Sequence, residues 1–234
     1  MQQTAAAPPT AAGGTGQNAR GTAITFLSQR WALDQFIPNG RGAAVLDVGA
    51  ADGSWLRYLE AKRFAPIYAV EHHAERATAA ARLGYTNVFC CTAEAVPLEC
   101  CSVQVVFAHN VLTLITDRDA KIRTLRRLSE VCAVGGVIIA NHPSTLAYYG
   151  HNGYEVNDYV SFADVDEFTR WVTAADPMLQ WRYTPPPWWI WALRKTMRLP
   201  GIPRIAFWTD RVWSSRVLPA SASDLLYYKI DKMA

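Results

Sequence analysis

Glycines and carboxylates suited to a nucleotide ligand follow the first two strand-like runs of the chain. In "VLDVGAADGSWLRYL", residues 45–59, a short apolar run meets Gly49 and Gly53, and helix-like sequence follows at once. Glycines let the backbone pass close to a ligand, and the start of a helix offers N–H groups that can donate to it. Glu71 ends the next apolar run, "PIYAVE". A carboxylate about 20 residues beyond such a turn suits the two hydroxyls of a ribose.

The composition of the turn separates two classes of nucleotide ligand. A dinucleotide site favours G-x-G-x-x-G, in which the middle glycine makes room for a pyrophosphate. Here Ala51 holds the middle position and Asp52 adds a negative charge beside it, which is unfavourable next to a pyrophosphate. S-adenosylmethionine carries an ammonium and a sulfonium and has no phosphate. The turn therefore favours S-adenosylmethionine over a dinucleotide.

Strand-like and helix-like segments alternate around these residues. Strands are predicted at 44–48, 66–71, 86–91, 103–109 and 137–141, and helices at 54–62, 73–84 and 117–132. A further helix, 164–174, opens with Asp164 as its cap and Glu167 three residues later. Strands at 179–183 and 225–232 follow it. This alternation predicts a mostly parallel sheet with helices on both faces, which binds ligands at the carboxyl ends of its strands.

Five segments occur in order between about Val45 and Asn141: "VLDVGAADG", "YAVE", "CTAEAVPL", "SVQVVFAHNVLTLITD" and "LRRLSEVCAVGGVIIAN". Together they resemble the motifs of class I S-adenosylmethionine-dependent methyltransferases, in the group that includes ubiquinone, menaquinone and many natural-product methyltransferases. The resemblance implies an α/β fold, a Rossmann-like doubly wound sheet of seven strands. The sheet would be mostly parallel with an antiparallel final strand. It also implies S-adenosyl-L-methionine as the cofactor.

The same resemblance assigns roles residue by residue. It implies that the methionine part of the cofactor is surrounded by Asp47, Gly49, Ala50, Ala51 and Gly53, that Glu71 takes the ribose hydroxyls, and that the adenine is edged by Thr92, Ala93 and Glu94. His109 would lie near the cofactor at the end of its strand. The sequence departs from the family at three places. Thr92 replaces the usual Asp, Gln104 replaces another Asp and is predicted to be structural, and Thr113 and Leu114 stand where histidines are frequent.

Two histidines are the candidates for a catalytic base. Methyl transfer depends largely on in-line alignment, but a hydroxyl acceptor also benefits from a base. His109 and His142 both follow predicted strands at the ligand-binding edge. For each of them a packing or capping role is the alternative.

The overall composition is that of a globular protein of 234 residues, with 50% hydrophobic and 18% charged residues. Its five cysteines include two adjacent pairs, and adjacent strand residues point to opposite faces. They are predicted to be small buried hydrophobes, and no metal site is expected. Signal-peptide and membrane-spanning segments are not predicted. A cytoplasmic location is therefore expected, with peripheral membrane contact as a further option.

Basic and aromatic residues concentrate near the C-terminus. Residues 185–234 hold 8 Lys/Arg against 3 Asp/Glu, whereas residues 1–184 hold 15 against 17. A domain at 22–234 is predicted behind a disordered tail, 1–21, with residues 185–222 as a Trp- and Arg-rich lid insertion. The insertion would be a core cover, a wall for the substrate or a membrane-surface contact. Nucleic-acid binding is disfavoured, and the arginines of "RTLRRL" are predicted to form a solvated helix face.

The sequence thus predicts a methyltransferase acting on a small molecule, by O-methylation of a glycan, lipid-linked or secondary-metabolite acceptor. Alternatives are an RNA or protein methyltransferase, and a non-catalytic S-adenosylmethionine-binding protein of the same fold.

Overall fold

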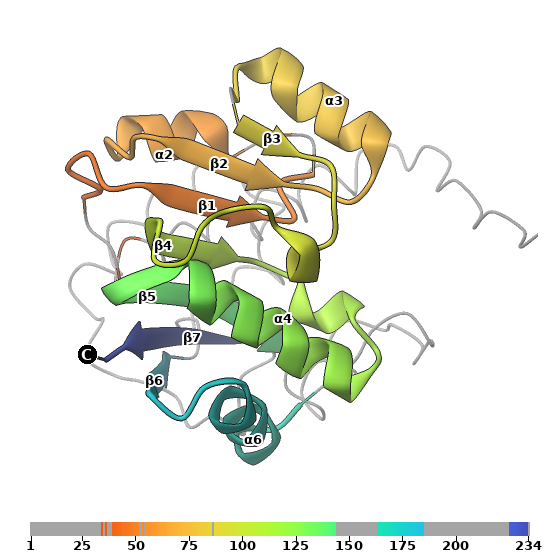
Figure 1. Ribbon diagram of the computed structural model, residues 1–234, viewed down its shortest axis with the longest axis vertical. Coiled ribbons are helices and arrows are strands. Elements are labelled where there is room, and N and C mark those ends of the chain that lie inside the picture. The colour runs from red at the N-terminus through yellow and green to blue at the C-terminus, as the bar shows by residue number, and fades with distance from the viewer. Residues whose placement is uncertain are drawn as a thin grey trace, which may run out of the picture.

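The computed structural model describes the part of the chain that carries all five motifs (Figure 1). The described residues are 34, 36, 39–51, 53, 55–85, 87–143, 163–184 and 225–233. The predicted tail at 1–21, the insertion at 185–222 and Asp52 lie outside them. The roles of these segments therefore stay predictions.

A seven-stranded sheet forms the centre of the molecule, in the order β3-β2-β1-β4-β5-β7-β6. The strands are β1 (Val45–Val48), β2 (Ile67–Val70), β3 (Asn87–Phe89), β4 (Val103–Ala108), β5 (Cys132–Pro143), β6 (Leu179–Thr184) and β7 (Leu225–Lys232). β1 pairs in parallel with β2 and β4, and β7 is antiparallel to both β5 and β6. The predicted doubly wound sheet with an antiparallel final strand is confirmed.

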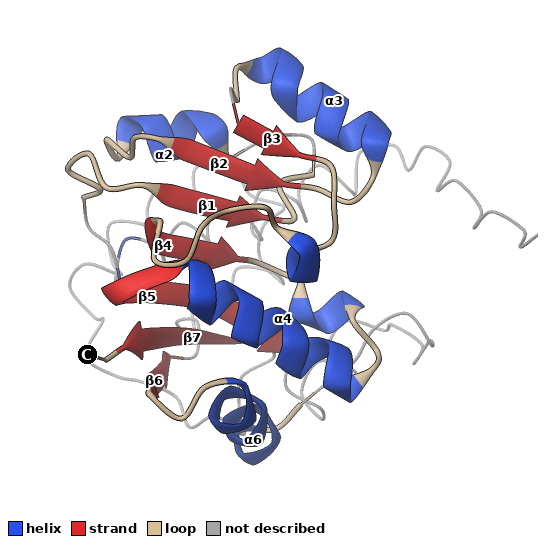
Figure 2. Cartoon of the chain, in the orientation of Figure 1, coloured by secondary structure: helices blue, strands red, loops and turns tan. Residues whose placement is uncertain are grey.

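Helices cover both faces of this sheet (Figure 2). They are α2 (Leu56–Ala61), α3 (Ala74–Leu83), α4 (Arg118–Val131) and α6 (Val165–Ala175), with short 3₁₀ turns η1 (Ala93–Ala95) and η2 (Leu112–Leu114). Leu125 and Leu128 of α4 and Phe168 of α6 pack in one core cluster with Leu46 and other sheet residues. Residues of α2 pack in a second cluster on Val45 and Phe107, on the opposite face.

All four residues of β1 are buried, as expected for a central parallel strand with both faces covered. Side chains alternate between the faces of a strand, so Val45 and Asp47 face the α2 side, while Leu46 and Val48 face α4. β1, β2, β3 and β4 run in the same direction, and their arrowheads lie along one edge of the sheet (Figure 1). That edge carries the residues predicted to bind the ligand.

The two long helices begin at capping aspartates. Asp117 accepts a hydrogen bond from the Ala120 N–H at 2.6 Å, and Asp164 accepts one from the Glu167 N–H at 2.7 Å. Each side chain satisfies an N–H group that has no partner within its helix. The predicted start of α6 at Asp164 is confirmed.

The structure corrects two expectations about the later strands and the cysteines. β5 begins at Cys132 rather than at residue 137, and its pairing with β4 shifts register between Val103 and Val105. The strand therefore runs through Gly135 instead of starting after it. Cys132 is buried as predicted, but Cys90, Cys100 and Cys101 are exposed, so they do not serve as core hydrophobes.

Among the described residues, no helix combines the length and apolarity needed to span a membrane.

Candidate cofactor site at the carboxyl edge of the sheet

The turn after β1 owes its shape to three residues with left-handed backbone conformation. Gly49, Ala51 and Gly53 have φ angles of +73°, +50° and +79°. The N–H groups of Gly49 and Ala50 both donate to the Val70 carbonyl, at 2.8 and 3.0 Å, which fastens the turn to the end of β2. Glycine adopts such angles without strain, whereas Ala51 is held in them at a steric cost. The turn is therefore tight and fixed against the neighbouring strand.

Glu71 is the carboxylate that joins this turn to the end of β2. Only 3% of it is exposed. Its Oε2 accepts from the Ala51 N–H at 2.9 Å, and its Oε1 accepts from the His73 N–H at 2.9 Å. Oε1 also lies 3.2 Å from Nδ1 of the exposed His72, whereas Oε2 has a second lone pair. Glu71 therefore retains acceptor capacity for a ligand hydroxyl while its orientation is fixed.

Asp47 is a second buried carboxylate, 2% exposed, on the adjacent strand. The Tyr85 hydroxyl donates to its Oδ2 at 2.9 Å. Burial raises the pKa of Asp47 from its ordinary 3.8 to about 7, the Tyr85 hydrogen bond lowers it, and the negative charge of Glu71 raises it. Two buried acids on neighbouring strands make this edge of the sheet favourable for a ligand that carries positive charge.

His109 belongs to a small polar network at the ends of β4 and β5. Asn141, which is fully buried, accepts from the Asn110 N–H through Oδ1 at 2.6 Å and donates through Nδ2 to Asn110 Oδ1 at 2.7 Å. The same Nδ2 lies 3.2 Å from His109 Nε2. Since an amide nitrogen can only donate, Nε2 is the acceptor and the ring proton is placed on Nδ1.

Loss of hydration lowers the pKa of His109 to about 3, so the imidazole is neutral at pH 7. A base of that strength drives proton transfer weakly at neutral pH. The contact with Asn141 and the lowered pKa together favour a positioning role for His109 at the end of β4, and its catalytic role stays a prediction.

His142, the second candidate base, is fully buried and lies on the other face of the sheet. Its ring meets Trp171 of α6 edge-on, with the ring centroids 5.3 Å apart. Asn141, one residue earlier, contacts His109 instead. The structure therefore does not bring His142 together with Asp47 and Glu71. Its catalytic role also stays a prediction, and its surroundings are those of a packed core residue.

The loop predicted to edge the adenine, residues 91–98, is tied to α4. Arg127 donates to the carbonyls of Val96 and Leu98 at 2.6–3.2 Å. Glu94 Oε2 accepts from Arg123 Nε at 3.1 Å, so its carboxylate is directed toward α4. Thr92 is exposed, and Ala93 packs against the edge of the core.

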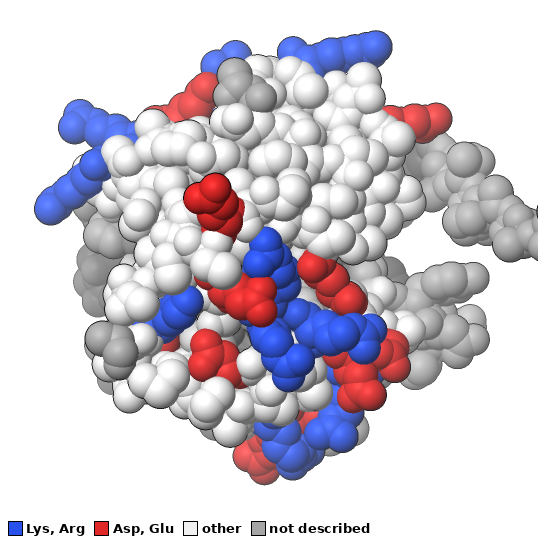
Figure 3. All heavy atoms as spheres, viewed as in Figure 1, with Lys and Arg blue, Asp and Glu red and all other residues white. Residues whose placement is uncertain are grey.

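The arginines of α4 were expected to form a solvated helix face. Arg123 and Arg126 are exposed, as expected, whereas Arg127 is partly buried. Arg127 holds the loop carbonyls, and Arg126 donates to the carbonyls of Ala174 and Ala175 at the end of α6. Figure 3 shows that the basic side chains over α4 and α6 are interspersed with acidic ones. This face has mixed charge, which does not favour contact with nucleic acid.

Tyr85 and Asn141 contact the candidate site residues Asp47 and His109, and the sequence analysis did not identify either of them. Tyr85 follows the Gly84 that ends α3, and it reaches Asp47 across 38 positions of the chain. Asn141 was recognised only as the end of a strand. Its position at the carboxyl end of β5, next to the β4 edge, was the available signal.

Gly53 cannot be replaced without disturbing the packing of the turn on α3. A Cβ at this position would lie 3.1 Å from Ala80 Cα, 3.1 Å from the Tyr85 ring and 3.2 Å from Leu83. Its φ of +79° adds strain for any other residue. Gly53→Ala is expected to lower the free energy of unfolding by about 1–3 kcal/mol, measured by urea denaturation. Gly42→Ala is the control, because φ is similarly +81° there but no atom lies within 4 Å. Equal losses in both variants would mean that packing on α3 does not matter.

Comparison with known proteins identifies the segment that contains this site. Residues 46–140 match a family model described as a methyltransferase domain. A search of curated protein sequences finds no match.

Solved structures share the fold across most of the chain. A methyltransferase dependent on S-adenosylmethionine from Thermotoga maritima, described as a possible histamine N-methyltransferase, has 15% identity and a TM-score of 0.61, covering 92% of this chain and 95% of its own. One from Mesorhizobium loti has 12% identity and a TM-score of 0.61, covering 88% and 99%.

The phosphoethanolamine N-methyltransferase 2 of Haemonchus contortus, solved with S-adenosyl-L-methionine, has 14% identity and a TM-score of 0.62, covering 89% of this chain and 53% of its own. At these identities the likeness shows the fold alone.

Proposed function

We propose that this chain is a class I S-adenosylmethionine-dependent methyltransferase that methylates a small molecule at an oxygen atom. The match of residues 46–140 to a methyltransferase-domain model supports the activity. The proposal also covers the acceptor and the roles of individual residues. The acceptor would be a glycan, a lipid-linked compound or a secondary metabolite.

The observation that carries the proposed cofactor site is the pair of buried carboxylates, Asp47 and Glu71, at the carboxyl ends of adjacent strands. Glu71 is held by two backbone N–H groups in a fixed orientation. A fixed carboxylate with unused lone pairs matches the two hydroxyls of a ribose. A negatively charged edge matches an ammonium and a sulfonium and opposes a phosphate. The residues present therefore fit S-adenosylmethionine.

When bound, S-adenosylmethionine supplies an activated methyl group, which an acceptor atom attacks in line. The chain contributes binding and orientation. Glu71 would hold the ribose, the turn at 49–53 would lie beside the methionine part, and Thr92, Ala93 and Glu94 would edge the adenine. Such positioning provides much of the acceleration in a reaction whose leaving group is already activated.

Small-molecule specificity is proposed to come from the aromatic and basic residues of the segment 185–222. Five of the nine tryptophans fall there (Trp188, Trp189, Trp191, Trp208 and Trp213). Tryptophan stacks on sugar and aromatic rings, and arginine binds phosphate and carboxylate groups. Nitrogen is the alternative acceptor atom, because two of the similar structures are described as N-methyltransferases.

Calorimetry with S-adenosylmethionine on the full chain tests the cofactor site, and transfer of a labelled methyl group to a panel of small molecules tests the acceptor. Binding is expected, and no binding at millimolar cofactor would refute the proposed site. Mass spectrometry of the product identifies the methylated atom. Transfer only to nitrogen, or only to RNA or protein, would refute the proposed acceptor. Binding without any transfer would favour a non-catalytic cofactor-binding protein.

A further inference from the structure

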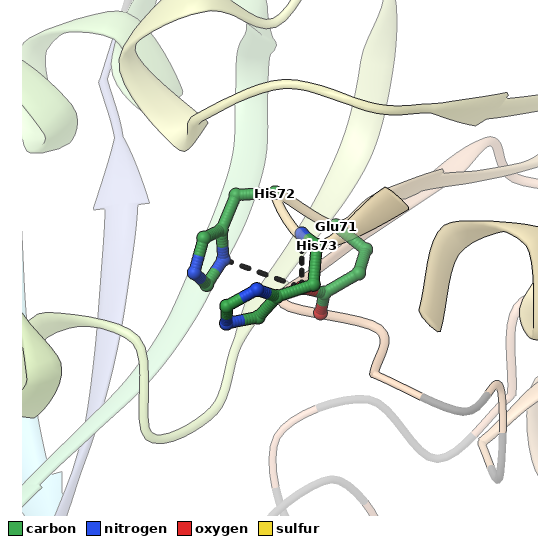
Figure 4. Close-up of side chains that lie close together, drawn as sticks. All are labelled: Glu71, His72 and His73. Carbon is green, nitrogen blue, oxygen red and sulfur yellow. Dashed lines mark hydrogen bonds and ion pairs between the residues drawn. The ribbon is translucent and has the colours of Figure 1, made fainter. Parts of the chain in front are cut away.

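Two exposed histidines follow Glu71 directly, in the bend between β2 and α3. The three ligand atoms offered by Glu71, His72 and His73 all lie within 4.8 Å of one another. His72 Nδ1 is 3.2 Å from Glu71 Oε1, and the His72 and His73 ring centroids are 3.8 Å apart. Figure 4 shows both imidazole rings beside the Glu71 carboxylate. Of these three residues, only Glu71 has a role in the proposed methyl transfer.

We propose that Glu71, His72 and His73 bind a transition-metal ion such as Zn²⁺, and that this ion excludes the ribose of the cofactor from Glu71. The metal site depends only on the three side chains. The exclusion rests on the proposed role of Glu71 in ribose binding.

The chemistry of the ligands supports the metal. Imidazole and carboxylate are ordinary Zn²⁺ ligands, with bonds of about 2.0–2.2 Å, so two ligand atoms on one tetrahedral ion stand about 3.4 Å apart. The distance of 3.2 Å between His72 Nδ1 and Glu71 Oε1 is close to this separation. Three protein ligands leave a fourth position for water.

The environment of the cluster supports binding from solution. Glu71 is 3% exposed and fixed by the Ala51 and His73 N–H groups, so one ligand is already in place. The His72 side chain is 54% exposed and His73 is also exposed, so an ion reaches the ring nitrogens without any rearrangement of the core. The carboxylate would have to serve either the ion or the ribose, which makes their binding mutually exclusive.

Calorimetric titration of the full chain with Zn²⁺ tests the metal site. A site is expected in the wild type, and the double variant His72→Gln/His73→Gln is expected to bind at least on the order of tenfold more weakly. Glu75→Gln is the matched control. It removes an exposed carboxylate from the first turn of α3, directly after the bend, and leaves all three proposed ligands in place. Equal affinity in the wild type and the double variant would overturn the site.

The cysteines are the competing ligands, since Cys90, Cys100 and Cys101 are exposed. Binding of Co²⁺ distinguishes a cysteine site from the Glu71–His72–His73 site, because thiolate ligands give an intense charge-transfer absorption that imidazole and carboxylate ligands do not give. A Co²⁺ spectrum without that absorption, lost in the double variant, supports the histidine site. A thiolate spectrum that persists in the double variant overturns it.

Competition tests the exclusion. At a Zn²⁺ concentration ten times its Kd, the apparent Kd for S-adenosylmethionine should rise about tenfold in the wild type and stay constant in the double variant. Zn²⁺ binding through the histidines without this rise would overturn the exclusion and leave the metal site standing. If S-adenosylmethionine does not bind at all, the proposed cofactor site fails, and the Zn²⁺ titration still decides the metal site.

Discussion

Replacing Glu71 by alanine is expected to weaken S-adenosylmethionine binding on the order of 100-fold. Hydrogen bonds to a charged group contribute about 1.5–3 kcal/mol each, and the proposed site loses two of them to the ribose. A total of about 3 kcal/mol corresponds to about a 100-fold change in Kd. Isothermal calorimetry at fixed pH measures the change directly.

The variant also removes the acceptor of the Ala51 and His73 N–H groups. Thermal unfolding of Glu71→Ala must therefore be compared with that of Glu71→Gln, which retains one carbonyl acceptor. Glu75→Ala, an exposed acid in the first turn of α3, is the control for a general loss of negative charge. A folded Glu71→Ala protein with wild-type affinity would remove Glu71 from the cofactor site.

Asp47→Asn is expected to raise the free energy of unfolding of the ligand-free protein, relative to the wild type, as the pH rises. Between pH 4 and alkaline pH the difference between the two proteins should grow by up to about 4 kcal/mol. Burial raises the pKa of Asp47 from 3.8 to about 7, with the Tyr85 hydrogen bond opposing and the Glu71 charge assisting the rise. The folded state therefore keeps a proton that the unfolded state releases between pH 3.8 and 7. The contribution of Asp47 to the free energy of unfolding therefore falls as the pH rises from 3.8 to 7, and it is constant above pH 7.

Asparagine has no proton to lose, so the stability of the variant lacks this contribution at every pH. The difference between variant and wild type should grow from pH 4 to pH 7 and then stay constant, as measured by urea denaturation at each pH. Asp119→Asn, at an exposed position in α4, is the control. A difference for Asp47→Asn that does not change with pH would show that Asp47 ionises as an ordinary acid.

The fold was predictable because short sequence patterns, such as apolar runs and helix-capping residues, mark its strands and helices. The apolar run before Gly49 forms a central strand, and the capping pair Asp164 and Glu167 marks the start of α6. Gln104 was predicted to be structural, and its side chain accepts from the Ala44 N–H at 2.8 Å, which ties β4 to the approach of β1. In each case the residue acts on its own element or on the adjacent strand.

The candidate site was predictable only in part. The positions of Asp47 and Glu71 at the strand ends followed from the motifs. Tyr85 and Asn141 act through contacts between elements that are distant in sequence. No local pattern indicates Tyr85, and the only signal for Asn141 is its position at the end of a strand. The exposure of the cysteine pairs was not predicted either. The argument that adjacent side chains point to opposite faces holds only in a strand, and Cys100 and Cys101 are not in one. They lie in the turn before β4, where Cys101 has a φ of +59°.

Two consecutive arginines of α4 connect parts of the molecule that are far apart in the chain. Arg126 donates to the last carbonyls of α6, where a positive charge also favours the helix dipole, and Arg127 donates to the carbonyls of the loop at 96–98. α4 therefore contacts, through neighbouring residues, both the end of α6 and the loop proposed to edge the adenine. A displacement of α6 would therefore strain the hydrogen bonds of Arg126, the direct chain neighbour of the arginine that holds this loop.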